Sequence, residues 1–378
     1  MKKLSILSLL VVLTKLCFAQ EIELDKEKLL ELYQSQRYAE AASYLSGVYP
    51  SDTKDVKALT QIAYCNMMAG KLVDAEKNYQ NINELQPQQI PVLFSLSNIN
   101  SRRGNKKKAI DYLQQVITID SNNFNAYKRL ADYTDSLKLK VQYLKTANQL
   151  NNLDGDVAYD LAFAYRKLEI YQPAYDALKI AIAADTANFV LQQALLPIAH
   201  QLKKYNEVVS VGEKILANDT DPKVIADVAK AHFYLNNYKK AIGYYQMLEK
   251  MEMQNEATLY FITLCYREVK NYDLAATFAK RTITEAISPN TYSYYNLLAN
   301  IYEEKQQLSN ASSAYKKALS YKVNKNSYYG LGLLYDLKLN QPKLALSNYN
   351  LYLKSKELNK SDQPQVDYVK ARLVLLKK

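Results

Sequence analysis

Residues 155–186 read GDVAYDLAFAYRKLEIYQPAYDALKIAIAADT, and this stretch decides the fold. Its small and apolar residues recur at spacings of three and four, which places them on one face of a helix. The pattern occurs twice, so we predict two helices joined by a short turn. Nowhere do apolar and polar residues alternate over a length that would suit a β-sheet. The residues that carry the pattern are Ala158, Leu161, Ala162 and Tyr165, then Tyr171, Ala174, Leu178 and Ala181.

The same arrangement recurs along the chain with a period near 34 residues, marked by one small residue in each repeat. Successive markers lie 34, 34, 65, 34, 33, 34, 36 and 34 residues apart, and the gap of 65 holds two repeats, one of them shortened. A small side chain fits where the second helix approaches the first closely. The markers are Ala41, Ala75, Ala109, Ala174, Val208, Ala241, Ala275, Ala311 and Ala345.

This pattern resembles the tetratricopeptide repeat family, with a tyrosine often three residues before the marker and a large residue four after it. The resemblance covers nearly all of residues 22–358, although tryptophan, common at one family position, is absent from the chain. It implies an all-α, right-handed superhelical solenoid of about ten helix-turn-helix repeats, with first helices along the concave side. Stacked repeats bury one continuous core, which no single repeat could do alone.

The predicted organisation has three parts. Residues 1–19 form a signal segment, residues 20–358 the solenoid, and residues 359–378 a linker and a capping helix whose outer face is expected to be polar. Within the repeats, Gly70 and Gly104 fall in turns. Pro173 and Pro342 fall at the expected first position of second helices.

The N-terminus predicts export. Two lysines precede an apolar run from Leu4 to Leu13, and Ala19 supplies the small residue of a cleavage site. Lys15 interrupts the apolar stretch before it could span a membrane, so we expect no transmembrane segment. Cleavage after Ala19 would give a periplasmic or secreted protein beginning at Gln20. A lipid on Cys17 remains the alternative.

Positive charge gathers at the C-terminal end. The chain has a net charge of +11, and residues 315–378 alone hold 13 Lys plus Arg against four Asp plus Glu. Export and the small number of arginines argue against nucleic acid as a partner. The alternatives are an ordinary solvated face, or a docking end for an acidic partner or the envelope surface. The lysines of this candidate basic docking end are Lys316, Lys317, Lys322, Lys325, Lys354 and Lys356.

No motif for catalysis, a metal or a cofactor emerges, so we expect a protein that is not an enzyme and needs no cofactor. His200 and His232 lie on neighbouring first helices without an obvious third ligand. Gly330-Leu331-Gly332 falls inside a predicted helix, where it cannot cradle a phosphate. Pro197 interrupts an otherwise helical stretch, and we expect a kink there.

The leading hypothesis is a binding scaffold of the bacterial cell envelope that holds peptide segments or protein partners in its concave groove. Three first helices carry a second stripe, at i, i+4 and i+7, that mixes rings with basic groups and suits a ligand with carboxylates and apolar side chains. The alternatives are a glycan or peptidoglycan binder, suggested by the 34 tyrosines, and an envelope assembly or secretion component. The stripes are Tyr159, Phe163 and Arg166; Ala226, Lys230 and Phe233; and Tyr260, Leu264 and Arg267.

Overall fold

The computed structural model describes residues 23–286 and 289–377, so the predicted signal segment and its cleavage site lie outside the described residues. The described part contains 21 α-helices and no β-strand, which confirms the all-α prediction. In chain order they form ten consecutive pairs followed by one last helix, as the period near 34 predicts. The chain divides into two compact units, residues 1–170 and 171–378, which we describe separately.

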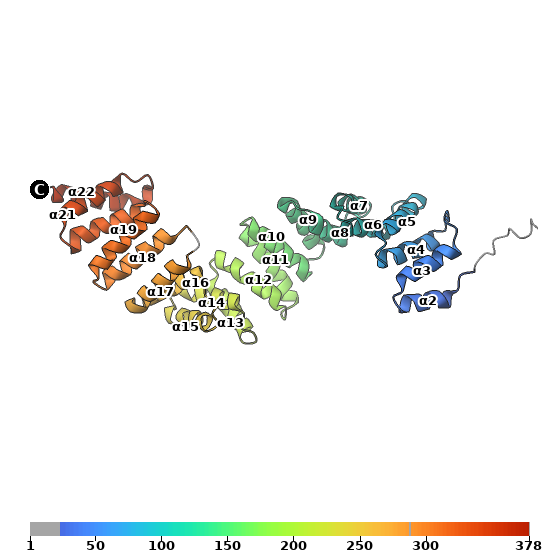
Figure 1. Ribbon diagram of the computed structural model, residues 1–378, viewed down its shortest axis with the longest axis horizontal. Coiled ribbons are helices and arrows are strands. Elements are labelled where there is room, and N and C mark those ends of the chain that lie inside the picture. The colour runs from blue at the N-terminus through green and yellow to red at the C-terminus, as the bar shows by residue number, and fades with distance from the viewer. Residues whose placement is uncertain (1–22, 287–288, 378) are drawn as a thin grey trace, which may run out of the picture. The chain divides into compact units, whose positions relative to one another are not determined.

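Each helix of unit 1 packs against the next one along the chain (Figure 1). The cores of the hairpins consist of leucine, isoleucine, valine and alanine from facing stripes. The helices are α2 (Lys26–Gln34), α3 (Tyr38–Val48), α4 (Val56–Met68), α5 (Leu72–Leu85), α6 (Ile90–Arg102), α7 (Lys106–Ile119), α8 (Phe124–Tyr133), α9 (Leu137–Leu150) and α10 (Gly155–Lys167).

Unit 2 continues the same pattern and is richer in aromatic residues, which join the aliphatic ones in its two largest cores. Its helices are α11 (Tyr171–Ala184), α12 (Phe189–Gln201), α13 (Tyr205–Leu216), α14 (Pro222–Tyr234), α15 (Tyr238–Lys250), α16 (Glu256–Glu268), α17 (Tyr272–Glu285), α18 (Thr291–Glu304), α19 (Leu308–Tyr321), α20 (Lys325–Leu333), α21 (Pro342–Leu353) and α22 (Gln363–Leu376).

The nine marker residues lie near the start of second helices, and every one of them has a relative exposure of 0%. This burial confirms that they sit where two helices meet most closely, because a larger side chain would have no space in such a contact. In the shortened repeat, Lys140 is the fourth residue of α9 and stands where the other second helices have the marker.

The turn inside each of the nine hairpins with a marker uses a left-handed backbone conformation five residues before that marker. Gly70 and Gly104 have φ values of +77° and +79°, as the sequence predicts. The N–H of the next residue returns to the end of the first helix, as when Lys71 donates to the carbonyl of Asn66 at 2.9 Å. Seven other turns place a larger residue in this conformation: Gln36, Glu169, Lys203, Asn236, Lys270, Gln306 and Asn340.

The prolines follow the predictions in part. Pro342 is the first residue of α21, whereas Pro173 is the third residue of α11. The prediction for Pro173 was wrong by two positions, because α11 begins at Tyr171. Proline is still tolerated at this third position, since the first N–H groups of a helix have no intrahelical partner. α12 continues through Pro197 as one helix, and the expected kink stays a prediction.

The last hairpin contains a π-helical turn, η1 (Leu334–Lys338), directly after α20. It turns Asp336 towards α22, where the carboxylate accepts two hydrogen bonds from Arg372, at 2.7 and 2.8 Å. Val369 and Leu373 of α22 join the core that α21 helps to form. The prediction of a polar outer face was wrong in part, because Val374 and Leu375 are 61% and 55% exposed.

Candidate functional site: the first helices of unit 2

The first helices of neighbouring hairpins contact each other in unit 2, α12 with α14 and α14 with α16. Second helices show no comparable packing against one another within the described residues. A stack whose elements lie closer on one side curves towards that side. The first helices therefore line the inner face of this stretch, as the family resemblance implies.

Aromatic rings cover the seams between these first helices. Phe233 and Tyr234 of α14 lie 5.3 and 6.1 Å from Phe261 of α16, centroid to centroid. Tyr234 also stacks on Tyr205 at 4.8 Å, with the ring planes only 7° apart. We call these rings the aromatic belt, which consists of His200, Tyr205, Phe233, Tyr234, Tyr260 and Phe261.

The belt remains accessible although its rings pack on each other. Tyr234 is 44% exposed, and the other rings, apart from buried His200, are half-buried. The ammonium group of Lys230 lies 5.2 Å from the centroid of Phe261, within the range of a cation–π interaction. Ring pairs of this kind contribute about 0.5–1.5 kcal/mol each beyond their burial, so the belt is a preformed surface rather than a set of mobile side chains.

The sequence pattern predicted two of the six rings of this belt, Phe233 and Tyr260. It selected Lys230, Phe233 and Tyr260, which the structure brings together around Phe261. It missed Phe261 and Tyr234, which lie next to selected residues in the sequence. Residues at i, i+4 and i+7 lie on one face of a helix, whereas the contact between two helices also uses side chains from the adjacent face.

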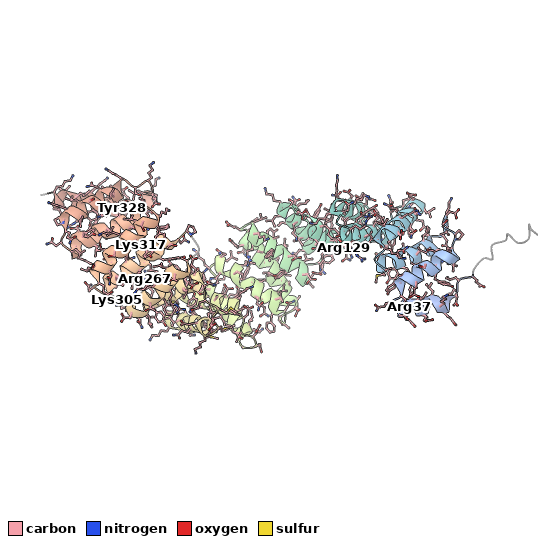
Figure 2. The ribbon with its side chains drawn as sticks, in the orientation of Figure 1. Arg37, Arg129, Arg267, Lys305, Lys317 and Tyr328 are labelled. Carbon is pink, nitrogen blue, oxygen red and sulfur yellow. The ribbon has the colours of Figure 1, made fainter. Side chains whose placement is uncertain are left out.

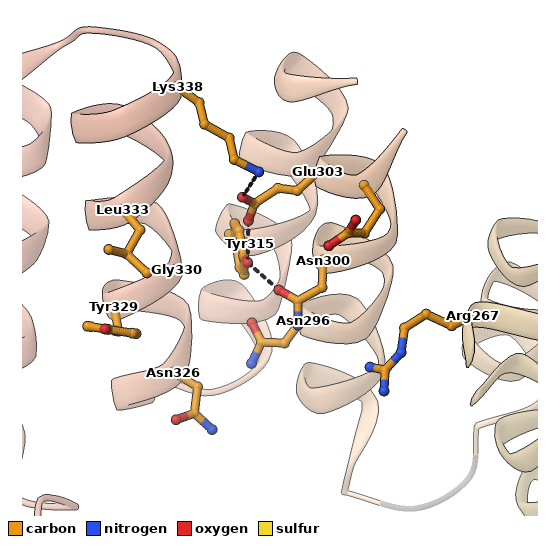
Figure 3. Close-up of a pocket in the computed structure, with 11 residues that line it drawn as sticks. Arg267, Asn296, Asn300, Glu303, Tyr315, Asn326, Tyr329, Gly330, Leu333 and Lys338 are labelled. Carbon is orange, nitrogen blue, oxygen red and sulfur yellow. Dashed lines mark hydrogen bonds and ion pairs between the residues drawn. The ribbon is translucent and has the colours of Figure 1, made fainter. Parts of the chain in front are cut away.

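Arg267 lies two turns beyond Tyr260 on α16. It lines a pocket of about 500 Å³ between α16, α18 and α20 (Figure 3). Its guanidinium pairs with the adjacent Glu268 at 2.7 Å. The pocket is lined by polar groups from three first helices and by one ring from a second helix. The lining residues are Arg267, Asn296, Asn300, Glu303, Glu304, Tyr315, Asn326, Tyr329, Gly330, Leu333 and Lys338.

Tyr315 reaches this pocket from α19 because Gly330 has no side chain. A Cβ atom at position 330 would lie 2.5 Å from Cζ of Tyr315 and 2.8 Å from its hydroxyl oxygen. Gly332 has the same relation to Tyr349, with a Cβ contact of 2.4 Å. The prediction that this Gly-x-Gly lies inside a helix is confirmed, and the structure adds its purpose: each glycine admits a tyrosine ring.

The hydroxyl of Tyr315 fixes the polar groups of the pocket. It donates to Oε1 of Glu303 at 2.7 Å and also touches the side-chain amide of Asn300. Burial and the nearby Glu303 raise the pKa of Tyr315 far above its usual value, so the phenol keeps its proton. The contact with the phenol oxygen is made by Oδ1 of Asn300, so the NH₂ group of this amide takes no part in it. That NH₂ group is left to donate to a ligand carbonyl.

Glu303 is neutralised by Lys338, whose ammonium lies 2.9 Å from Oε2 (Figure 3). Asn296 is also engaged, since Ser327 donates to its Oδ1 at 2.5 Å. The groups that remain available are the NH₂ group of Asn300, the exposed Asn326, the half-buried Tyr329 and the exposed carboxylate of Glu304. Apart from this carboxylate they are neutral hydrogen-bonding groups, which suit an amide-bearing ligand.

The remaining groove candidates lie on α10 in unit 1. Tyr159 and Phe163 are 38% and 42% exposed. The guanidinium of Arg166 and the ammonium of Lys167 lie 5.7 and 4.7 Å from the ring centroid of Phe163. These residues form a local ring-and-cation cluster of their own, which we describe within unit 1 only. A similar pair occurs earlier in this unit, where Arg129 (Figure 2) lies over the ring of Phe94 at 5.1 Å.

The histidines have separate partners. Nε2 of His200 lies 2.8 Å from the backbone oxygen of Asp227, and burial lowers the pKa of this histidine. Nε2 of His232 lies 3.3 Å from Oε1 of Glu213. Among the described residues, no group of three or more His, Cys, Asp or Glu side chains is arranged to hold a metal ion.

The predicted basic docking end is partly neutralised. Lys322 pairs with Glu357 at 3.3 Å, and Lys325 pairs with Asp362 at 2.6 Å. Lys316 and Lys317 (Figure 2) instead lie near the rings of Tyr335 and Tyr321. Lys354 and Lys356 are exposed.

Comparison with known proteins agrees with the repeat type. Residues 90–123 match the tetratricopeptide repeat profile, and residues 168–328 match the profile of the ChAPs (Chs5p-Arf1p-binding proteins). Both matches cover less than half of the chain. Together with the ten helix pairs, they support the tetratricopeptide repeat family for these repeats.

One curated relative is the UDP-N-acetylglucosamine--peptide N-acetylglucosaminyltransferase of Caenorhabditis elegans, 28% identical over 81 residues. The match covers 21% of this chain and only 7% of that protein.

Similar solved structures include a tetratricopeptide repeat protein from Parabacteroides merdae, with 15% identity and a TM-score of 0.39, covering 80% of this chain and all of that one. YrrB, described as having an unusual peptide-binding site, has 14% identity and a TM-score of 0.37 over 44% of this chain and 87% of its own. The Naa15/Naa10 complex bound to HypK has 12% identity and a TM-score of 0.44, over 93% of this chain and 65% of the matched one.

No helix in the described ranges is both long and apolar enough to cross a membrane.

Proposed function

We propose that this protein is a non-enzymatic binding scaffold of the bacterial cell envelope that holds an extended peptide segment along the first helices of unit 2. The observation that supports the proposal most directly is the continuity of two surfaces on α16. The aromatic belt includes Tyr260, and the polar pocket begins at Arg267, seven residues later on the same face. Export to the envelope rests on the N-terminal sequence.

The two surfaces recognise different parts of a peptide. Apolar side chains of the ligand would lie against the aromatic belt, where Lys230 and Arg267 can attract an acidic side chain. The main chain would then pass the pocket, where the NH₂ group of Asn300 can donate to a backbone carbonyl. An acidic, apolar peptide therefore suits the belt, and its backbone suits the pocket.

The test uses an array of extended twelve-residue peptides that vary in acidic and apolar content. Phe233→Ala combined with Lys230→Ala should weaken binding at least tenfold, because it removes one ring and one cation from the belt. Phe163→Ala combined with Arg166→Ala tests the cluster of unit 1 in the same way. Leu274→Ala with Lys280→Ala, an exposed apolar and basic pair on α17, is the matched control and should bind as wild type.

Three results would count against the proposal. Equal loss in the control would show that binding is not located in the groove. Lost helicity with unchanged affinity per folded molecule would make the belt purely structural. Binding to cell-wall glycan fragments on a parallel array, with no peptide bound, would favour the glycan-binding alternative.

A further inference from the structure

The outward face of α21 combines leucines with lysines. Ala345, Tyr349 and Tyr352 are buried on the inner side of this helix. Leu344 and Leu351 are 44% and 40% exposed on the other side. The exposed Lys343 and Lys354 lie on that outer side as well, since their spacing from the leucines follows the helical repeat.

This face is unusual among the second helices of the chain. Leu344 and Leu351 stand one residue before and six residues after the marker Ala345. Of the nine second helices that carry a marker, α21 is the one with leucine at both positions. In α13, for example, these positions hold Glu207 and Lys214. Because the rest of the outer surface is mostly polar, the leucines of α21 are not a general feature of the repeat.

The neighbouring helix α22 exposes a similar combination of side chains. Lys370 and Val374 each lie two residues from Arg372, and a step of two residues turns a helix by about 200°. Arg372 points towards Asp336, so Lys370 and Val374 point away from it. Lys370, Val374 and Lys377 are all exposed. We define the basic–apolar face as Lys343, Leu344 and Leu351 of α21 and Lys354 directly after it, with Lys370 and Val374 of α22 and Lys377 directly after it.

The charge of this face is not fully compensated by nearby carboxylates. Residues 315–378 contain four acidic residues, and three of them pair with other cations: Asp336 with Arg372, Glu357 with Lys322, and Asp362 with Lys325. Within residues 289–377, none of the lysines of the basic–apolar face is found in an ion pair. The fourth acidic residue, Asp367, accepts a hydrogen bond from Gln363 and lies one turn before Lys370 on α22. The face therefore keeps a net positive charge, whereas Lys322 and Lys325 beside it are neutralised.

We infer that the basic–apolar face docks the protein on the surface of an anionic lipid bilayer. Lysines attract the negative headgroups, and the leucine and valine side chains enter the boundary between headgroups and acyl chains. The face belongs to the outer side of the last hairpin, whereas the pocket is lined by α20, the other helix of that hairpin. Lipid docking would thus leave the pocket accessible, and the inference stands independently of peptide binding.

The test is sedimentation with large unilamellar vesicles of phosphatidylcholine, with or without 40% phosphatidylglycerol. The protein used begins at Gln20, because the apolar run near the N-terminus would itself bind vesicles. We expect binding only to the vesicles with phosphatidylglycerol, weakening as salt rises. Lys343→Gln with Lys354→Gln should reduce the partition coefficient on the order of 20-fold.

Leu344→Ser with Leu351→Ser changes no charge and should also reduce partitioning, which separates insertion from simple attraction. Lys239→Gln with Lys240→Gln on α15 is the matched control for charge and should change partitioning less than twofold. Equal loss in that control, or equal binding to both kinds of vesicle, would overturn the inference. Capture of soluble polyglutamate without vesicle binding would also overturn it, in favour of an acidic protein partner. Should the serine variant lose helicity, the lysine pair and its control decide the question.

Discussion

The replacement Gly330→Ala tests how the pocket of unit 2 is built. In a helix, alanine normally stabilises relative to glycine by about 0.5–1 kcal/mol. Here the added Cβ would meet two ring carbons and the hydroxyl oxygen of Tyr315 between 2.5 and 2.8 Å. Overpacking of this kind costs about 1–3 kcal/mol. Displacing the ring also removes a hydrogen bond to the charged Glu303, which contributes about 1.5–3 kcal/mol. We therefore expect a net destabilisation of about 3 kcal/mol.

Urea unfolding followed by circular dichroism measures this change, and Gly243→Ala on α15 is the matched control. Nothing lies within 4 Å of a Cβ atom at position 243, so this replacement should stabilise the protein slightly. In the background Tyr315→Ala, Gly330→Ala should cost far less, because the clashing ring is gone. Destabilisation that is unchanged in that background, or a Gly330→Ala variant as stable as Gly243→Ala, would refute the role given to the glycine.

Three further predictions follow from the turns, the last helix and the N-terminus. Gln306→Gly should raise stability by up to about 1 kcal/mol in the same assay, and Gly70→Ala should lower it similarly, because both positions are left-handed. The Arg372 guanidinium lowers the pKa of Asp336, so this pair stabilises the fold above about pH 4, the ordinary aspartate value, and the stabilisation is lost as pH falls through the lowered pKa. Between pH 6 and pH 2, the free energy of unfolding should fall more steeply in the wild type than in Asp336→Asn. N-terminal sequencing of protein recovered from the periplasm of its host should show that the chain begins at Gln20. A lipid on Cys17 would contradict this prediction.

Local spacing was enough to predict the helical architecture. The interval of about 34 residues between small residues fixed the number of hairpins, because a close helix–helix contact excludes large side chains wherever it recurs. The same reasoning placed Gly70 and Gly104 in turns. It did not reveal the seven turns with larger residues, since a hairpin held by its core can impose a left-handed conformation on glutamine or lysine at a modest cost.

The candidate site needed contacts between hairpins. Spacing selected Phe233 and Tyr260 as single stripes, and the structure showed that Phe261 lies between them. Of the pocket at α18 and α20 the sequence pattern selected only Arg267, because the central ring comes from α19 and passes over a glycine of α20. The spacing of residues within one helix cannot show that a side chain of another helix packs against it.

The fold class, the number of repeats and the excess of basic residues near the C-terminus could all be read from the chain before any contact was known. All three depend only on the order and identity of the residues. Which rings join into a belt, which lysines are neutralised and which leucines stay exposed became clear from the folded contacts. Lys325 and Lys354 look alike in the sequence, yet one lies 2.6 Å from Asp362 and the other is exposed. The difference is one of distance in space, because charge interactions and burial depend on neighbours that the chain brings together only when it folds.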